Sequence, residues 1–128
     1  MQELQIKTKI YLDKLNGHKK IKKNILELIE KSDSYTFKYK DVYYNDSIKK
    51  LDWNNNHIID RPWVKVLLPF IQKHFKKCAK KLGFEKCHIK ALWFQQYEKN
   101  NLHNWHIHAQ NYTGVYYLEL PKSAPLTK

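Results

Sequence analysis

The segment YEKNNLHNWHIH (residues 97–108), followed by the strand-like run YTGVYYLEL (residues 112–120), decides the fold that the sequence predicts. Both parts are rich in aromatic residues, which favour sheet. The first part also places three imidazoles, those of His103, His106 and His108, within six residues. Imidazole is the side chain most often used to hold a metal near neutral pH. The sequence therefore places the chemistry of this chain next to a predicted sheet.

His106 and His108 form the candidate metal site. In an extended strand successive side chains alternate between faces, so these two imidazoles point the same way while Ile107 points the other. Two nitrogens on one side of a strand can bind a single ion, and we predict that they do. His103 is an odd number of positions away, so we expect it at the start of the strand or behind the ligands as a hydrogen-bonding support. The alternative is a polar, partly exposed loop whose histidines cluster by coincidence.

Length and composition indicate one domain, residues 1–128, in a reducing compartment. A chain with 42% hydrophobic and 14% aromatic residues can build a single core. The first residues, MQELQIK, lack the apolar core of a signal peptide, and no apolar run approaches the ~18 residues needed to span a bilayer. A cytoplasmic location is therefore expected, with Cys78 and Cys87 as reduced thiols. Their spacing, and their distance from the histidines, argue against a structural zinc site.

The order of the predicted elements, helices first and then consecutive strands, indicates an α+β fold. We expect helices at about 18–31 and 62–82, where Pro62 suits the first turn, Gly83 the residue after the end, and Pro69 should kink the helix. Strands are expected at about 5–12, 35–44, 87–98, 103–109 and 113–120, and an Asn- and Asp-rich loop at about 45–60. That loop holds Asp52, Trp53, Asp60 and Arg61, which could cover the site.

A formal charge of +12 raises the question of a polyanionic partner. The basic residues gather at 18–23 and 73–81, and both clusters lie within predicted amphipathic helices. Their lysines are then the wet side of each helix, and those near residue 81 also complement the helix dipole. A solvated helix face is the favoured interpretation, with a polyanion-binding surface as its rival.

Three pieces of the chain together resemble a known family. They are WFQQY (residues 93–97), HNWHIH (residues 103–108) and YTGVYYLELP (residues 112–121). This series is similar to the first metal-binding half of the 2-oxoglutarate and Fe(II)-dependent oxygenases of the prolyl-hydroxylase type. It is closer still to largely viral and marine-microbial oxygenase-like proteins. The resemblance is specific from Trp93 to Pro121 and only general for residues 1 to 90.

The resemblance implies a hydroxylase-type dioxygenase that uses Fe(II) and 2-oxoglutarate, with ascorbate as a reductant in vitro and a substrate that the sequence does not name. It implies N-terminal helices packed on a double-stranded β-helix, the jelly-roll barrel. By match to the family pattern, Tyr117 and Tyr97 would line the 2-oxoglutarate pocket, beside the iron ligands His106 and His108. The alternative for both tyrosines is a core aromatic whose hydroxyl reaches the surface. For a viral protein the expected location becomes the host cytoplasm.

Two departures from the family pattern shape the expectation. His108 stands where the larger superfamily has Asp, so two histidines and one carboxylate cannot be assembled from His106 and His108 alone, and a three-histidine iron site is the alternative. The family's distal His and the basic residue that pairs with 2-oxoglutarate lie on later strands. We therefore expect an incomplete barrel, inactive by itself, that could self-associate through an open sheet edge. The competing class is a basic, non-enzymatic nucleic-acid- or partner-binding protein, viral or otherwise.

Overall fold

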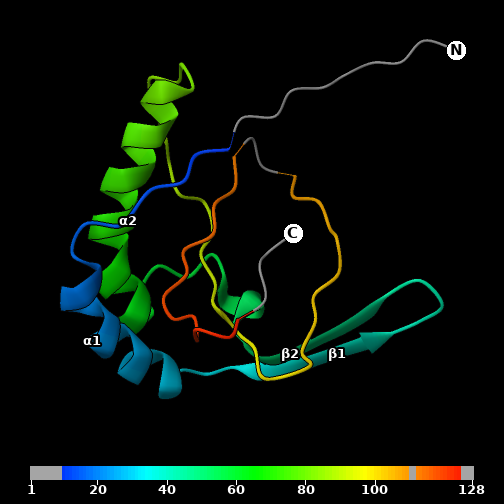
Figure 1. The fold of residues 1–128 in the computed structure, drawn as a ribbon. Coiled ribbons are helices and arrows are strands. Elements are labelled where there is room, and N and C mark those ends of the chain that lie inside the picture. The colour runs from blue at the N-terminus through cyan, green and yellow to red at the C-terminus, as the bar shows by residue number, and fades with distance from the viewer. Residues whose placement is uncertain (1–9, 110–111, 125–128) are drawn as a thin grey trace, which may run out of the picture.

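The computed structural model describes residues 10–109 and 112–124, which form an α+β fold of two helices and one small sheet. The elements are α1 (His18–Glu30), β1 (Tyr35–Lys40), β2 (Asn45–Leu51), a 3-10 turn (Trp53–Asn55), α2 (Pro62–Lys81) and β3 (Gln95–Gln96). The α+β class predicted from the sequence is confirmed. The sheet is open and antiparallel, with the order β1-β2-β3, and the described residues form no jelly roll or β-helix (Figure 1).

Both helices were predicted to within one residue at each end. Helix α2 begins at Pro62 and runs through Pro69, and Gly83 follows it with a φ of 87°. The Gly83 amide donates to the carbonyl of Lys80 and the Phe84 amide to that of Ala79, which completes a Schellman cap. Helix α1 begins after Gly17, whose φ is 88°. A Cβ there would lie 2.7 Å from the Phe70 ring, so Gly17 lets the chain pass close over α2.

The core lies between the two helices and the segment that leads into β3. The two helices pack side by side, and the last described segment returns between the helices and the sheet (Figure 1). Helix α1 contributes the isoleucines at a spacing of four residues that its apolar stripe predicts. The buried members of this core are Ile21, Ile25, Ile29, Trp63, Val64, Leu67, Ile71 and Phe94. None of the helices in the described part of the chain is long and apolar enough to cross a membrane.

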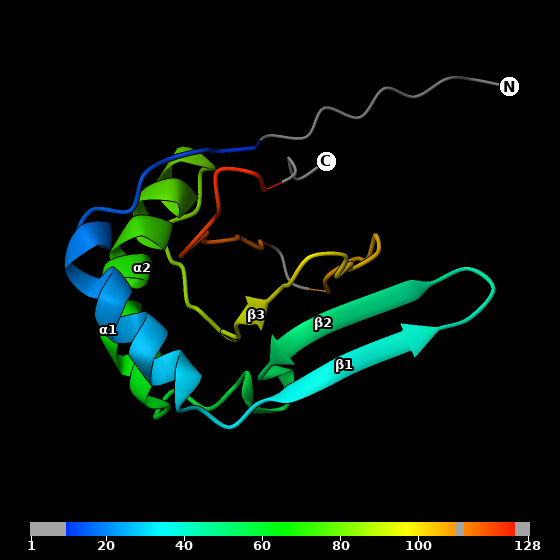
Figure 2. The same cartoon turned by 60° about the horizontal axis from the view of Figure 1, so that its bottom comes forward.

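Strands β1 and β2 form a hairpin that projects away from the helices (Figure 2). The sequence prediction of a loop at 45–60 was wrong here, because residues 45–51 are strand β2 and the loop begins only after Leu51. Asp41 organises the turn: its Oδ1 accepts the amides of Tyr43 and Tyr44 at 2.7 and 2.6 Å. Strand β2 forms although its sequence is polar, because its backbone pairs with β1.

The strands expected in the C-terminal third are mostly absent from the described residues. Of residues 87–98 only Gln95 and Gln96 form a strand, which pairs with the end of β2. Residues 103–109 and 112–120 are irregular, and one isolated bridge joins Leu102 to Ser47. A strand needs a partner edge, and β2 offers these segments only its last two residues and Ser47. Of the strand expected at 5–12, residues 5–9 lie outside the described part and 10–12 are irregular.

The buried carboxylate of Asp52 fixes the start of β3 against the helices. Its Oδ1 accepts the Phe94 amide at 2.8 Å, and its Oδ2 accepts the Trp63 indole at 3.1 Å and the Arg61 guanidinium. Arg61 also donates to the carbonyls of Leu92, Ile58 and Asn56. Asp52 and Arg61 therefore tie the segment after β2 to α2 and β3, whereas the sequence suggested only a loop that could cover the site. Asp60 stays exposed and pairs with Lys65 at 3.1 Å.

Candidate metal centre

The structure brings His106 and His108 together on one side of the chain. Their Nε2 atoms lie 3.1 Å apart. The Nδ1 of His106 lies 2.8 Å from the carbonyl oxygen of Asn104. Because a carbonyl only accepts, His106 donates from Nδ1, and its Nε2 accepts a hydrogen bond from the Nε2–H of His108, a proton that a bound metal ion would replace. A backbone carbonyl behind an imidazole is a common way to fix the tautomer of a metal-binding histidine.

The spacing of the two nitrogens suits a shared ion. Nitrogens bound at about 2.1 Å to one metal lie about 3.0 Å apart at a right angle and about 3.4 Å apart at the tetrahedral angle. The observed 3.1 Å falls between these values. The two imidazoles lie on one side of the chain as predicted, but not for the predicted reason, because residues 103–108 do not form a strand.

His103 lies on the same side as the other two, which the sequence did not predict. Its ring stacks on that of His106, with centroids 4.1 Å apart and planes at 18°. Burial lowers the pKa of His103, the neighbouring His106 and His108 lower it further, and Asp46 opposes them. A stacked ring presents its face rather than a nitrogen to its neighbour. His103 therefore packs against His106 and is not expected to be a third metal ligand beside His106 and His108. Within residues 10–109 and 112–124, no group of three or more His, Cys, Asp or Glu side chains is arranged to hold a metal.

The hairpin holds the imidazole segment in place. The Asn104 amide donates to Asp46 Oδ1 at 2.7 Å, and Leu102 exchanges two backbone hydrogen bonds with Ser47 at 2.7 and 2.9 Å. The side-chain nitrogen of Asn104 is buried without a hydrogen-bond partner in the structure. The position of the site thus depends on β2, the element that the sequence left as a loop.

Tyr97 is linked to the imidazoles through Gln95. The Tyr97 hydroxyl donates to Gln95 Oε1 at 2.8 Å, and Gln95 Nε2 lies 3.4 Å from His103 Nδ1. Desolvation, with smaller contributions from Asp46 and Tyr117, raises the pKa of Tyr97 to about 12. Its phenol therefore stays protonated and able to donate at any pH near neutrality.

Tyr116 and Tyr117, adjacent in the last segment, have different surroundings, as expected for neighbouring residues whose side chains point in opposite directions. Tyr116 is partly buried against the helices, and its hydroxyl lies 2.6 Å from His18 Nδ1. Tyr117 is 46% exposed and is close enough to Tyr97 to influence its ionisation. The two tyrosines predicted for a 2-oxoglutarate pocket thus share one region of the molecule.

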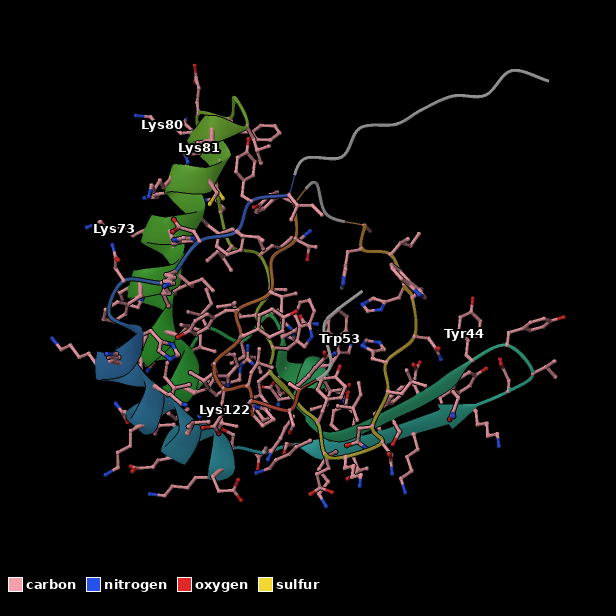
Figure 3. All side chains as sticks on the ribbon, in the orientation of Figure 1. Tyr44, Trp53, Lys73, Lys80, Lys81 and Lys122 are labelled. Atoms are coloured by element: carbon pink, nitrogen blue, oxygen red, sulfur yellow. The ribbon has the colours of Figure 1, made fainter. Side chains whose placement is uncertain are left out.

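Two tryptophans, Trp93 and Trp53, continue the row of rings, and the sequence did not predict their contacts with each other and with His108. The Trp93 ring lies 5.6 Å from that of His108, at 37°, and Trp53 meets Trp93 edge-on at 4.5 Å. In Figure 3 the labelled side chains of Trp53 and Tyr44 both lie above the hairpin. Trp93 lies two residues before Gln95 and four before Tyr97, so alternation along a strand places all three on the same face.

Comparison of the sequence with protein-family models and with curated proteins finds no match, and comparison of the fold with solved structures finds none.

Proposed function

We propose that this chain is the metal-binding part of a hydroxylase-type dioxygenase dependent on Fe(II) and 2-oxoglutarate, with His106 and His108 as iron ligands. The observation that carries the proposal is the pair of Nε2 atoms 3.1 Å apart, one of them oriented by a backbone carbonyl. The sequence resemblance from Trp93 to Pro121 supplies the class of chemistry. The proposal includes the architecture of that class, helices packed on an incomplete jelly-roll sheet.

The residues fit part of this assignment. Two neutral imidazoles suit Fe(II), which when bound with 2-oxoglutarate supplies the oxidising power for hydroxylation. Within this chain, Asn104 keeps the proton of His106 on Nδ1. The protonated phenol of Tyr97 is a hydrogen-bond donor suited to a carboxylate of 2-oxoglutarate. Among the described residues, no lysine or arginine interacts with this hydroxyl. A third metal ligand and a cation for the cofactor must join these residues before catalysis.

Metal titration tests the proposal directly. Co(II), an oxygen-stable substitute for Fe(II), should bind at one site, followed by its visible absorption. We expect His106→Ala and His108→Ala each to weaken binding at least about tenfold and His103→Ala to weaken it only mildly. His57→Ala is the control, because His57 is exposed in a different loop. Binding should also weaken as the solution is made more acidic, because protons compete with the metal for the imidazole nitrogens.

Equal losses of Co(II) affinity in the alanine variants of His103, His106 and His108 would contradict the two-ligand site. Turnover is a separate measurement: succinate release from 2-oxoglutarate, with Fe(II) and ascorbate. We expect the 128-residue chain to match the no-protein control, because two imidazoles leave the ion weakly held and the cofactor unanchored. Succinate above that control would show that a further ligand has been overlooked or that a second copy of the chain supplies it.

A further inference from the structure

Five lysines form one continuous stripe on α2. They are Lys73, Lys76, Lys77, Lys80 and Lys81, called here the α2 lysine stripe, and all five are exposed. Their spacing of three, four, seven and eight residues places them on one helix face. Figure 3 shows Lys73 and Lys80 pointing outward from α2, on the side away from the hairpin.

The stripe is far less neutralised than the other basic regions of the molecule. Lys22 pairs with Glu119, Lys49 with Glu98 and Lys50 with Glu30. Helix α2 contains no acidic residue. Among the residues that the structure describes, Asp13 is the only carboxylate paired with the stripe, through Lys77 at 3.5 Å. Lys73, Lys76, Lys80 and Lys81 have no carboxylate partner there.

The fold does not account for this charge. Interaction with the helix dipole favours lysines only in the last turn, which contains Lys80 and Lys81 but not Lys73 or Lys76. Like charges three and four residues apart destabilise a helix. Repulsion between the lysines of the stripe therefore destabilises the folded chain, and a bound polyanion would remove that repulsion.

The structure favours a nucleic acid over a membrane surface. An interfacial helix needs a free apolar face, but the apolar side of α2 is buried in the core, with Trp63, Leu67 and Ile71 at most 7% exposed. From Lys73 to Lys81 the helix rises about 12 Å. The same length of duplex carries about seven phosphate charges. Lysine offers a point charge without the fixed geometry that reads bases.

We propose that the α2 lysine stripe binds the phosphate backbone of nucleic acid without sequence preference. This inference is independent of the metal site, which lies on other elements. Binding to a labelled duplex of about 20 base pairs should be measured by fluorescence anisotropy from about 50 to 200 mM salt. The variant replaces Lys73, Lys76, Lys80 and Lys81 by Gln. The control replaces Lys31, Lys38, Lys40 and Lys99, which are exposed and lie outside α2, and removes the same charge.

We expect the α2 variant to bind the duplex much more weakly than the unmodified chain at low salt. The plot of log K against log salt should become less steep by about 3 to 4, because four phosphate contacts are lost. The control should retain most of the affinity, and circular dichroism should show both variants folded. Equal losses in the two variants would overturn the proposal by showing that net charge alone is responsible. It would also be overturned if the unmodified chain bound vesicles containing phosphatidylserine but not the duplex, or bound neither.

Discussion

Asp52 is the buried charged residue among those that the structure describes. It is 1% exposed and accepts hydrogen bonds from Arg61, Trp63 and Phe94. A buried charge is costly unless it is paired and hydrogen-bonded, and Asp52 meets both conditions. Its three donors come from the start of α2 and from the residue before β3. One side chain thus joins segments that are up to 42 residues apart.

We predict that Asp52→Ala lowers the free energy of unfolding by about 3–5 kcal/mol, because it removes the counter-ion of the Arg61 guanidinium and leaves the N–H groups of Trp63 and Phe94 buried without an acceptor. Urea denaturation followed by circular dichroism measures the change. Asp60→Ala is the matched control: its carboxylate is 90% exposed and pairs with Lys65, so the loss should stay below about 1 kcal/mol. Similar losses for the two variants would contradict the role given to Asp52.

At the scale of elements, Pro69 is an anomaly within α2. It lies in the interior of the helix, where proline cannot donate the hydrogen bond to the carbonyl four residues earlier. Its side chain is exposed, so no packing depends on it. Pro62, at the start of the same helix, removes only an amide that has no partner inside the helix.

Replacement of Pro69 by Ala should therefore raise the free energy of unfolding by about 1–3 kcal/mol, through one added hydrogen bond and a better helix former. Pro62→Ala, on the same helix, should be neutral or slightly destabilising. Thermal and urea unfolding of both variants provide the comparison. A Pro69→Ala variant that is less stable than the unmodified chain would mean that the helix geometry around Pro69 is required by the packing.

The helices and the strands differ in how far the sequence determines them. Apolar spacing together with Pro62 and Gly83 located α2, because helix hydrogen bonds are local. Strands need a distant partner: residues 45–51 pair although they are polar, and the aromatic run 112–120 shows no pairing in its described residues. The same holds for the site. Neighbouring positions predicted His106 and His108 on one side, but the contacts of His103 with Gln95 and of Trp93 with Trp53 depend on tertiary structure.

For the molecule as a whole, a net charge of +12 on 128 residues makes self-repulsion a property of the folded state. Compaction brings lysines together, most of all on α2, whereas the unfolded chain separates them. Exposed charges are screened by salt, and the buried Asp52–Arg61 pair much less so.

The midpoint of thermal unfolding should accordingly rise by a few degrees between low and about 0.5 M NaCl, equivalent to about 1 kcal/mol. Calorimetry or circular dichroism measures the shift. Replacement of Lys73, Lys76, Lys80 and Lys81 by Gln should reduce the dependence on salt and raise the midpoint at low salt. A midpoint that falls with added salt would show that the surface ion pairs outweigh the repulsion.

His106 and His108 are separated by a single residue, and this closeness has a consequence for thermodynamic linkage. An unfolded chain can bring the two imidazoles onto one ion at little cost in loop-closure entropy. An ion that binds the unfolded chain as well as the folded one stabilises neither state over the other. A local chelate of this kind should leave the thermal midpoint nearly unchanged even at saturating metal. A centre that also recruits a ligand from a distant segment would raise it.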